Sequence, residues 1–210
     1  MFKDRTEAGK ALAMTLLKYS GEDVVVLALP RGGVVLGYEV AKAIKAPLDI
    51  IPVRKIGLPG NPEYAVGVVD EKGTLLLNEG EAESIDKKWL ANEIEKEKKE
   101  ALRRSLAYRG NSPLINLKNK IVILTDDGIA TGFSMRLAVK RVMKDHPKKV
   151  VVAVPVAPAE SIRELERDGV DEIIVLEPPE EFKGAVGSHY RAFEQVTDAE
   201  VLGLLAESFI

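Results

Sequence analysis

Five apolar runs, nearly continuous and rich in β-branched residues, place the strongest constraint on the fold of this 210-residue chain. They cover residues 24–29, 49–55, 120–125, 149–156 and 171–177. Strands that are buried on both faces have this pattern, whereas half-exposed strands alternate apolar and polar residues. The intervals between the runs have helical spacing over residues 4–19, 34–45, 132–146 and 159–168. The alternation predicts an α/β fold, with a mostly parallel sheet flanked by helices.

A Gly/Pro-rich segment, residues 56–78, interrupts this alternation. It ends in two short strand-like runs around the sequence Asp70-Glu71-Lys72-Gly73, which is typical of a tight turn. The segment therefore predicts a loop followed by a hairpin. Long loops within domains are usually functional or disordered.

A second interruption, residues 83–110, predicts a long charged helix that stops at Gly110. Its charges alternate in sign, which favours a solvated helix; a hood or dimerisation helix is the alternative. We expect residues 1–210 to form a single domain with this helix as a hood insertion. The tail, residues 178–210, should contribute to the same hood.

The composition excludes several classes of function. The chain has no cysteine, which excludes disulfides, thiolate metal sites and thiol catalysis and suits a cytoplasmic protein. A net charge of −3 at pH 7 gives no general attraction to nucleic acid or to anionic membranes. No apolar run approaches the roughly 18 residues that a membrane span requires.

The most informative motif joins an apolar strand to a helix in "IVILTDDGIATGFS", residues 121–134. Asp126 and Asp127 end the strand, and carboxylates of this kind accept hydrogen bonds from sugar hydroxyls or from a metal-bound water. The helix that follows should present free N–H groups, and so a phosphate cradle, at Thr131, Gly132, Phe133 and Ser134. The combination predicts a sugar-phosphate site. The alternative is an ordinary strand-to-helix turn.

Two further strand ends carry cations. Pro30-Arg31-Gly32-Gly33 lies between a predicted strand and helix, where the two glycines permit backbone conformations closed to other residues and should expose N–H groups. Arg31 offers a planar fork suited to phosphate, and Arg54 and Lys55 end the run at 49–55 before the Gly/Pro-rich loop. Taken singly, each could be a solvated surface feature. Because ligands bind at the carboxyl ends of parallel strands, all three ends should form one site for an anionic ligand.

The stretch "VILTDDGIATGFS" resembles the motif with which type I phosphoribosyltransferases bind phosphoribosyl pyrophosphate. That motif has an apolar strand, two acidic residues, two mostly apolar positions and a small-Thr-Gly-x-Ser/Thr loop; Gly128 departs from it at a usually apolar position. The Arg31 loop looks like the pyrophosphate loop of that family, and "RKIGLP" looks like its adenine-type strand end and lid. The resemblance extends from about residue 24 to about residue 158. It points to a little-characterised bacterial or archaeal branch.

The resemblance implies transfer of 5-phosphoribose from phosphoribosyl pyrophosphate to a nitrogenous base or related acceptor, with release of pyrophosphate. It implies catalytic roles for Asp126, Asp127, Arg54 and Lys55. It implies substrate-binding roles for Arg31, Gly32, Gly33, Ala130, Thr131, Gly132, Phe133 and Ser134. Mg²⁺ would be held mainly by the donor's pyrophosphate, with Asp126 or Asp127 contributing through water. A homodimer is also expected.

The acceptor is less well defined by the sequence. Ala130 stands where members acting on 6-oxopurines carry an Asp, which fits the adenine-type pattern. Glu63 and Glu160 are candidates to handle an acceptor proton. Aromatic residues of the tail could stack on a base, although core packing explains them equally well: Phe182, Tyr190 and Phe193.

Two other classes of function stay open. One is a regulator that senses phosphoribosyl pyrophosphate or a nucleotide with this fold and has little catalysis. The other is an ordinary doubly wound nucleotide binder. Against the latter, no G-x-G-x-x-G or Walker lysine motif follows a strand.

Overall fold

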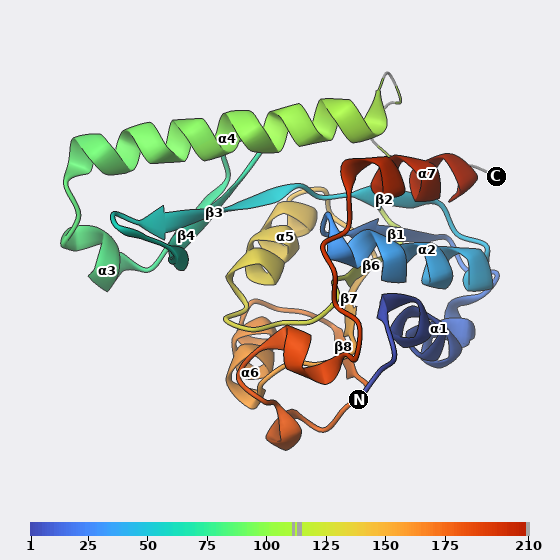
Figure 1. Ribbon diagram of the computed structural model, residues 1–210. Helices are drawn as coiled ribbons and strands as arrows, with labels where there is room; N and C mark the ends of the chain where they lie inside the picture. The colour runs from blue at the N-terminus through green and yellow to red at the C-terminus, as the bar shows by residue number, and fades with distance from the viewer. Residues whose placement is uncertain (111, 113–114, 209–210) are drawn as a thin grey trace.

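A parallel sheet of five strands organises the computed structural model, which describes residues 1–110, 112 and 115–208 (Figure 1). The strand order is β2-β1-β6-β7-β8, and every neighbouring pair is parallel. The strands are β1 (Val24–Ala28), β2 (Leu48–Ile50), β6 (Ile121–Thr125), β7 (Lys149–Val154) and β8 (Glu172–Val175). The predicted α/β class with a parallel sheet is confirmed.

Helices cover both faces of this sheet (Figure 1). One face carries α1 (Arg5–Leu16), α2 (Gly32–Ile44) and α7 (Asp198–Ser208); the other carries α5 (Phe133–Met143) and α6 (Ala159–Arg167). Within β1, Val24 and Val26 pack into the first core, whereas Val25 and Leu27 pack into the second. Both faces are therefore apolar, which explains why the runs in the sequence are continuous. Short 3-10 segments lie at Leu17–Tyr19, Pro179–Glu181 and Val186–His189.

A second, antiparallel sheet has the strand order β3-β4-β5. Its strands are β3 (Val53–Leu58), β4 (Asn61–Asp70) and β5 (Leu75–Leu77). Asp70 forms the predicted turn between β4 and β5, because its Oδ1 accepts hydrogen bonds from the N–H groups of Lys72 (2.9 Å) and Thr74 (2.7 Å). The hairpin predicted around the sequence Asp-Glu-Lys-Gly is confirmed.

Two predictions for this region are wrong. The run at 49–55 is not one strand, because Pro52 lacks the N–H that would continue the ladder; β2 ends at Ile50. Arg54 and Lys55 consequently belong to β3 of the second sheet, not to the end of a parallel strand. The predicted loop from residue 56 is the hairpin of β3 and β4, in which Gly60 has a φ of 78°.

The predicted charged helix is confirmed as α4 (Lys87–Arg109), preceded by the short α3 (Glu79–Glu83). Asp86 caps its start by accepting a hydrogen bond from the N–H of Trp89 (2.8 Å), and Gly110 follows its end with a φ of 56°. One side packs on β3 and β4, and the other exposes Leu106 (61%). In Figure 1 the helix runs along the outside of the second sheet and reaches α7. No helix in the described part of the chain has the length and apolar character needed to cross a membrane.

Candidate active site

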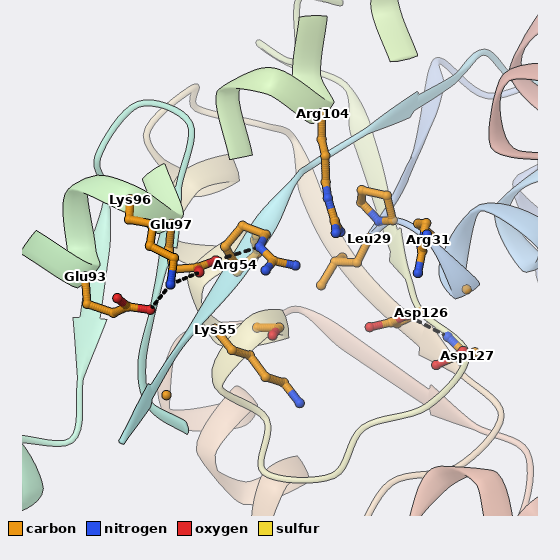
Figure 2. A pocket seen from close by; sticks show the side chains of 15 residues that line it. Leu29, Arg31, Arg54, Lys55, Glu93, Lys96, Glu97, Arg104, Asp126 and Asp127 are labelled. Atoms are coloured by element: carbon orange, nitrogen blue, oxygen red, sulfur yellow. Dashed lines mark hydrogen bonds and ion pairs between the residues drawn. The ribbon is translucent and has the colours of Figure 1, made fainter. Parts of the chain in front are cut away.

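A polar cavity of about 540 Å³ lies where the carboxyl ends of β1 and β6 face β3 and α4 (Figure 2). A second cavity, of about 570 Å³, follows the loop between β6 and α5 and reaches the tail. The two share four lining residues: Lys55, Asp126, Asp127 and Ser134. The three motifs singled out in the sequence therefore meet at one place.

The paired acids form the floor that the two cavities share. Asp127 Oδ2 accepts a hydrogen bond from Arg5 Nε at 2.7 Å, and Asp126 Oδ1 accepts one from the N–H of Asp127 at 2.8 Å. Burial raises the pKa of both carboxyls, and the charge of Asp127 raises that of Asp126 further. The positive charges of Arg5 and Lys55 oppose both shifts. A cation or a hydroxyl donor at this floor would favour the ionised form of the two carboxyls, whereas a phosphate would oppose it.

Arg5, from the first turn of α1, is a site residue that the sequence did not reveal. Besides binding Asp127, it donates through Nη1 to the carbonyl of Glu194 (2.8 Å), and its guanidinium lies 3.8 Å from the ring centre of Phe193. Arg5 occupies Oδ2 of Asp127, so Oδ1 is the oxygen left for a ligand. A lone arginine 122 positions away in the chain offers no sequence signal for such a contact.

The two glycines after Arg31 have a different role from the one predicted. Neither has a positive φ; both lie at the start of α2. A Cβ on Gly32 would lie 2.0 Å from Asp127 Oδ2, and one on Gly33 would lie 2.9 Å from the Cα of Asp126. The expectation of unusual backbone conformations was therefore wrong. These positions are glycine because the loop after β1 packs directly against the paired acids.

The loop at residues 131–134 (the 131–134 loop) has the geometry expected of a phosphate site. Gly132 precedes α5 with a φ of 77°, a left-handed conformation that favours glycine. Within the described residues, no hydrogen bond is formed by the backbone N–H groups of Thr131, Gly132, Phe133 and Ser134. Behind the loop, Ala130 is fixed by a hydrogen bond from Ser161 Oγ to its carbonyl (2.9 Å). Free N–H groups at a helix start attract an anion.

The adjacent cations Arg54 and Lys55 point to different partners, because successive side chains of a strand face opposite sides. Arg54 Nε donates to Glu97 Oε2 of α4 at 2.8 Å, and Glu97 is buried. Lys55 instead extends toward Asp126 (Figure 2). Both residues line the first cavity. Of the predicted basic pair, Arg54 is thus bound to α4, whereas Lys55 is directed at the paired acids.

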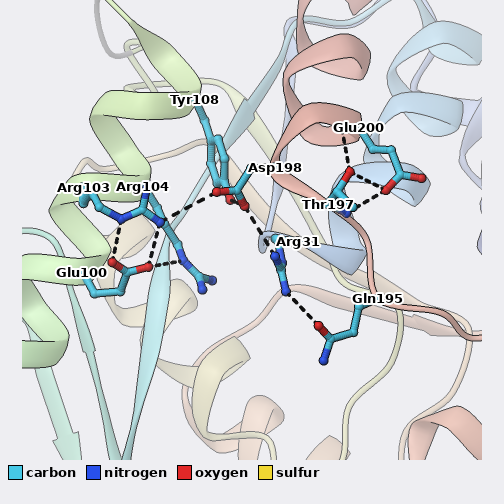
Figure 3. A network of polar contacts seen from close by, with 9 residues as sticks. All are labelled: Arg31, Glu100, Arg103, Arg104, Tyr108, Gln195, Thr197, Asp198 and Glu200. Atoms are coloured by element: carbon cyan, nitrogen blue, oxygen red, sulfur yellow. Dashed lines mark hydrogen bonds and ion pairs between the residues drawn. The ribbon is translucent and has the colours of Figure 1, made fainter.

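Arg31 takes part in a network that joins the loop after β1 to α4 and α7 (Figure 3). Arg31 Nη1 lies 3.5 Å from Asp198 Oδ1, the same oxygen that accepts a hydrogen bond from Tyr108 OH at 2.7 Å. That hydrogen bond lowers the pKa of Asp198, whereas burial raises the pKa of Tyr108 to about 12. The tail and α4 therefore both reach the loop that contains Arg31.

The predicted acceptor residues divide between the second cavity and the core. Phe193 lines the cavity together with Gly184–Gly187, whereas Tyr190 is buried and donates through its hydroxyl to the carbonyl of Asp127 (2.6 Å). Phe182 does not line the second cavity and instead stacks on His189, with ring centres 5.4 Å apart. Of the two candidate bases, Glu160 is exposed and lines neither cavity, and Glu63 belongs to β4, but its side chain lies outside the described part of the structure. Among the described residues, no group of three acidic or imidazole side chains could hold a metal.

Replacing Asp126 by asparagine should stabilise the fold at neutral pH. A carboxyl whose pKa is raised on folding costs stability progressively as the pH rises from its ordinary value through the raised one. Asparagine keeps the acceptor for the Asp127 N–H without that charge, and substitutions of this kind commonly add about 0.5–2 kcal/mol. Urea unfolding at pH 7 should show the gain for D126N, and the gain should vanish at about pH 3.

The matched control is Asp23→Asn, because the side chain of Asp23 is 70% exposed. We expect no comparable gain in the free energy of unfolding for this variant. A D126N protein that is less stable than wild type at pH 7 would contradict the electrostatic description of the paired acids.

Comparison with known proteins agrees with this geometry. A family model described as "Phosphoribosyl transferase domain" matches residues 4–189. The chain is 39% identical over 207 residues to "Putative phosphoribosyl transferase Rv0571c" of Mycobacterium tuberculosis (strain ATCC 25618 / H37Rv), which covers 98% of this chain and 46% of that protein. The chain therefore spans about half the length of the curated relatives that it matches.

Two solved structures extend the comparison. TT1426 from Thermus thermophilus has 42% sequence identity and a TM-score of 0.79, with 98% of each chain covered. AQ2163 from Aquifex aeolicus has 17% identity and a TM-score of 0.51, with 82% of this chain and 72% of that chain covered. The latter similarity concerns the fold alone.

Proposed function

Because this chain belongs to the phosphoribosyl transferase domain family, we propose that it transfers 5-phosphoribose from phosphoribosyl pyrophosphate to a nitrogenous base or related acceptor. One observation carries the proposal. Free N–H groups, paired carboxylates and a set of cations border cavities that share a common floor, in the order in which a phosphate, a ribose and a pyrophosphate follow one another in the donor.

Each part of the donor has a candidate partner. The 131–134 loop would bind the 5-phosphate through backbone N–H groups at the start of α5. Asp126, and Asp127 through its Oδ1, would accept hydrogen bonds from the ribose hydroxyls. Arg31 and Lys55 would neutralise the pyrophosphate, with Arg54 behind them. Gly32 and Gly33 allow the backbone of the Arg31 loop to pack directly against Asp126 and Asp127.

The reaction breaks the bond between ribose C1 and a pyrophosphate oxygen and forms one between C1 and the acceptor. The sugar becomes positively charged as pyrophosphate leaves, so the nearby carboxylates stabilise the transition state more than the ground state. Arg5 holds Asp127 in place and favours its ionised form. The cations of the first cavity stabilise the departing pyrophosphate, and the hairpin of β3 and β4 borders that cavity and would limit access of water.

Magnesium fits this arrangement as an ion carried by the donor. The described residues offer two adjacent carboxylates but no third ligand for a protein-held cage. Mg²⁺ would therefore be held mainly by pyrophosphate oxygens, with Asp126 or Asp127 contributing through water. When bound, it would supply charge neutralisation for the leaving group.

The acceptor would bind in the second cavity, where Phe193 and the Gly184–Gly187 segment face the loop after β6. Phe193 already packs against the Arg5 guanidinium and stacks on Tyr190, with ring centres 4.9 Å apart, so it would form part of the apolar wall of the acceptor site. Ala130 is exposed at the edge of this cavity, as in the adenine-type pattern.

A regulator that senses the donor is the second candidate function. Its supporting observation is that several cations of the site are paired with the chain's own carboxylates: Arg5 with Asp127, Arg31 with Asp198 and Arg54 with Glu97. Binding of an anionic donor could release the hood and tail carboxylates and so change their position. Such a protein would bind the donor without turning it over.

Measurement of pyrophosphate release separates the two functions. Phosphoribosyl pyrophosphate, Mg²⁺ and a panel of purine and pyrimidine bases are incubated with the protein, and release is followed continuously. Release that depends on one base supports the transferase. Tight donor binding without base-dependent release supports the regulator.

Replacing Arg31 by alanine should weaken the donor's binding or lower its turnover at least about tenfold, which corresponds to roughly 1.4 kcal/mol. The variant removes a guanidinium from the first cavity while leaving the loop's two glycines intact. Steady-state kinetics with varied donor concentration measure the change. Kinetics identical to wild type would remove Arg31 from the site.

A further inference from the structure

Arg104, on α4, reaches the same cavity as the Arg31 loop but from the opposite side. Figure 2 shows its side chain extending from the helix toward Leu29 and Arg31, and the residue lines the cavity. The side chain is only 16% exposed. Its Nε donates to Glu100 Oε1 at 3.0 Å, whereas its two Nη groups form no hydrogen bond with the described residues. A largely enclosed guanidinium is thus left with unused donors beside a polar cavity.

Glu100 fixes the position of this arginine. It lies four residues earlier on the same helix and also accepts hydrogen bonds from Arg103 Nε (2.7 Å) and Nη2 (2.9 Å). The hydrogen bonds from Arg103 and Arg104 lower the pKa of Glu100 to about 2, so the carboxylate stays ionised at neutral pH. Binding at Nε leaves the outer edge of the Arg104 guanidinium available to a ligand.

On the core side of the cavity, each cation near the pyrophosphate site also interacts with a carboxylate of the chain itself. Lys55 faces the paired acids, and Arg54 is held by the buried carboxylate of Glu97. Arg31 is the remaining guanidinium on that side, and it shares Asp198 with Tyr108. A group with several negative charges therefore needs a further cation, and the planar fork of an arginine suits phosphate oxygens.

We infer that Arg104 binds the pyrophosphate group of the donor from the hood side, opposite Arg31, and that Glu100 positions it. The inference rests on the proposed function, because the same cavity must accept phosphoribosyl pyrophosphate. It makes the hood helix part of the donor site. The pyrophosphate would then be held between α4 and the loop after β1.

Calorimetric titration with three ligands tests this assignment. Wild type and Arg104→Ala are titrated with inorganic pyrophosphate, ribose 5-phosphate and phosphoribosyl pyrophosphate, each with Mg²⁺. The variant should bind pyrophosphate and phosphoribosyl pyrophosphate about tenfold more weakly, the size typical of a lost charged hydrogen bond. Ribose 5-phosphate should be unaffected, because the second cavity, which contains the 131–134 loop, is lined by no described residue of α4.

Two variants serve as controls. Lys99→Ala removes one positive charge from the same helix, but Lys99 is exposed and does not line this cavity, so its affinities should equal those of wild type. Glu100→Gln keeps the shape of the side chain and removes the charge that positions Arg104. It should weaken pyrophosphate binding less than Arg104→Ala does.

The outcomes separate the inference from the proposed function. If wild type and Arg104→Ala bind pyrophosphate equally, the role of Arg104 is wrong and the proposed function stands. Equal weakening of all three ligands would also overturn the assignment, because it would indicate a general disturbance of the fold. If wild type binds none of the three, both the proposed function and the inference fail.

Discussion

Replacing Asp127 by asparagine should lower kcat/KM for phosphoribosyl pyrophosphate about a hundredfold. The charge of Asp127 lies at the shared floor of the two cavities, where the ribose becomes positively charged in the proposed reaction. Loss of one electrostatic stabiliser at a reacting centre costs about 10²–10³ in rate. The amide oxygen can still accept a hydrogen bond from Arg5 Nε, but the negative charge that pairs with this guanidinium is lost. Steady-state kinetics with varied donor measure the effect.

Asp145→Asn is a suitable control for this variant. The side chain of Asp145 is 38% exposed, pairs with Arg141 just beyond the end of α5, and lines neither cavity. Its kinetics should match those of wild type. A D127N protein with unchanged kcat/KM would exclude Asp127 from the chemistry.

Replacing Arg109 by alanine should reduce the free energy of unfolding by about 3–5 kcal/mol, the typical effect of breaking a buried ion pair from one side. Arg109 lies at the end of α4 and is only 11% exposed. Its Nε binds Asp49 Oδ1 at 2.7 Å, its Nη1 binds Ser105 Oγ at 2.7 Å, and its Nη2 binds the carbonyl of Ile50. The alanine variant leaves the buried carboxylate of Asp49 with the N–H of Ile50 but without a cation, and it removes the hydrogen bonds that join the end of α4 to β2.

Urea unfolding of this variant is compared with that of Arg167→Ala. The side chain of Arg167 is 72% exposed and pairs with Glu164 on the surface, so its removal should cost less than about 1 kcal/mol. Combining Arg109→Ala with Asp49→Asn should recover part of the lost stability, because position 49 then carries no buried charge without a cation. Equal losses in the free energy of unfolding for Arg109→Ala and Arg167→Ala would show that the Arg109 contacts do not stabilise the packing of α4 on β2.

The main sheet could be predicted from the sequence because its strands are buried on both faces and read as continuous apolar runs. The type I phosphoribosyltransferase-like fold inferred from the motif "VILTDDGIATGFS" is confirmed by the family match and by the similarity to TT1426. The second sheet was predicted only in part. Residues 49–55 read as one strand although Pro52 is a local signal for a break. That Arg54 and Lys55 then pair with β4 in another sheet depends on contacts between distant segments, which local patterns do not encode.

The candidate site likewise has residues that local sequence patterns could predict and residues that only tertiary packing brings in. The motifs at Arg31, Asp126 and the 131–134 loop could be found in the sequence because each lies between a strand and a helix, and the parallel sheet brings such ends together. Arg5 and Arg104 reach the site from helices by tertiary packing, and nothing in their local sequence distinguishes them from surface arginines. Gly32 was noticed, but the reason for it, the close approach of Asp127, required coordinates.

The most direct test of the proposed function is a calorimetric titration of the whole chain with phosphoribosyl pyrophosphate, with and without Mg²⁺. Wild type should bind the donor with a micromolar dissociation constant, about −8 kcal/mol, and binding should depend on Mg²⁺. The same titration of Asp127→Asn should show clearly weaker binding. Absence of donor binding to folded wild-type protein at either Mg²⁺ concentration would contradict the assignment of these cavities to phosphoribosyl transfer.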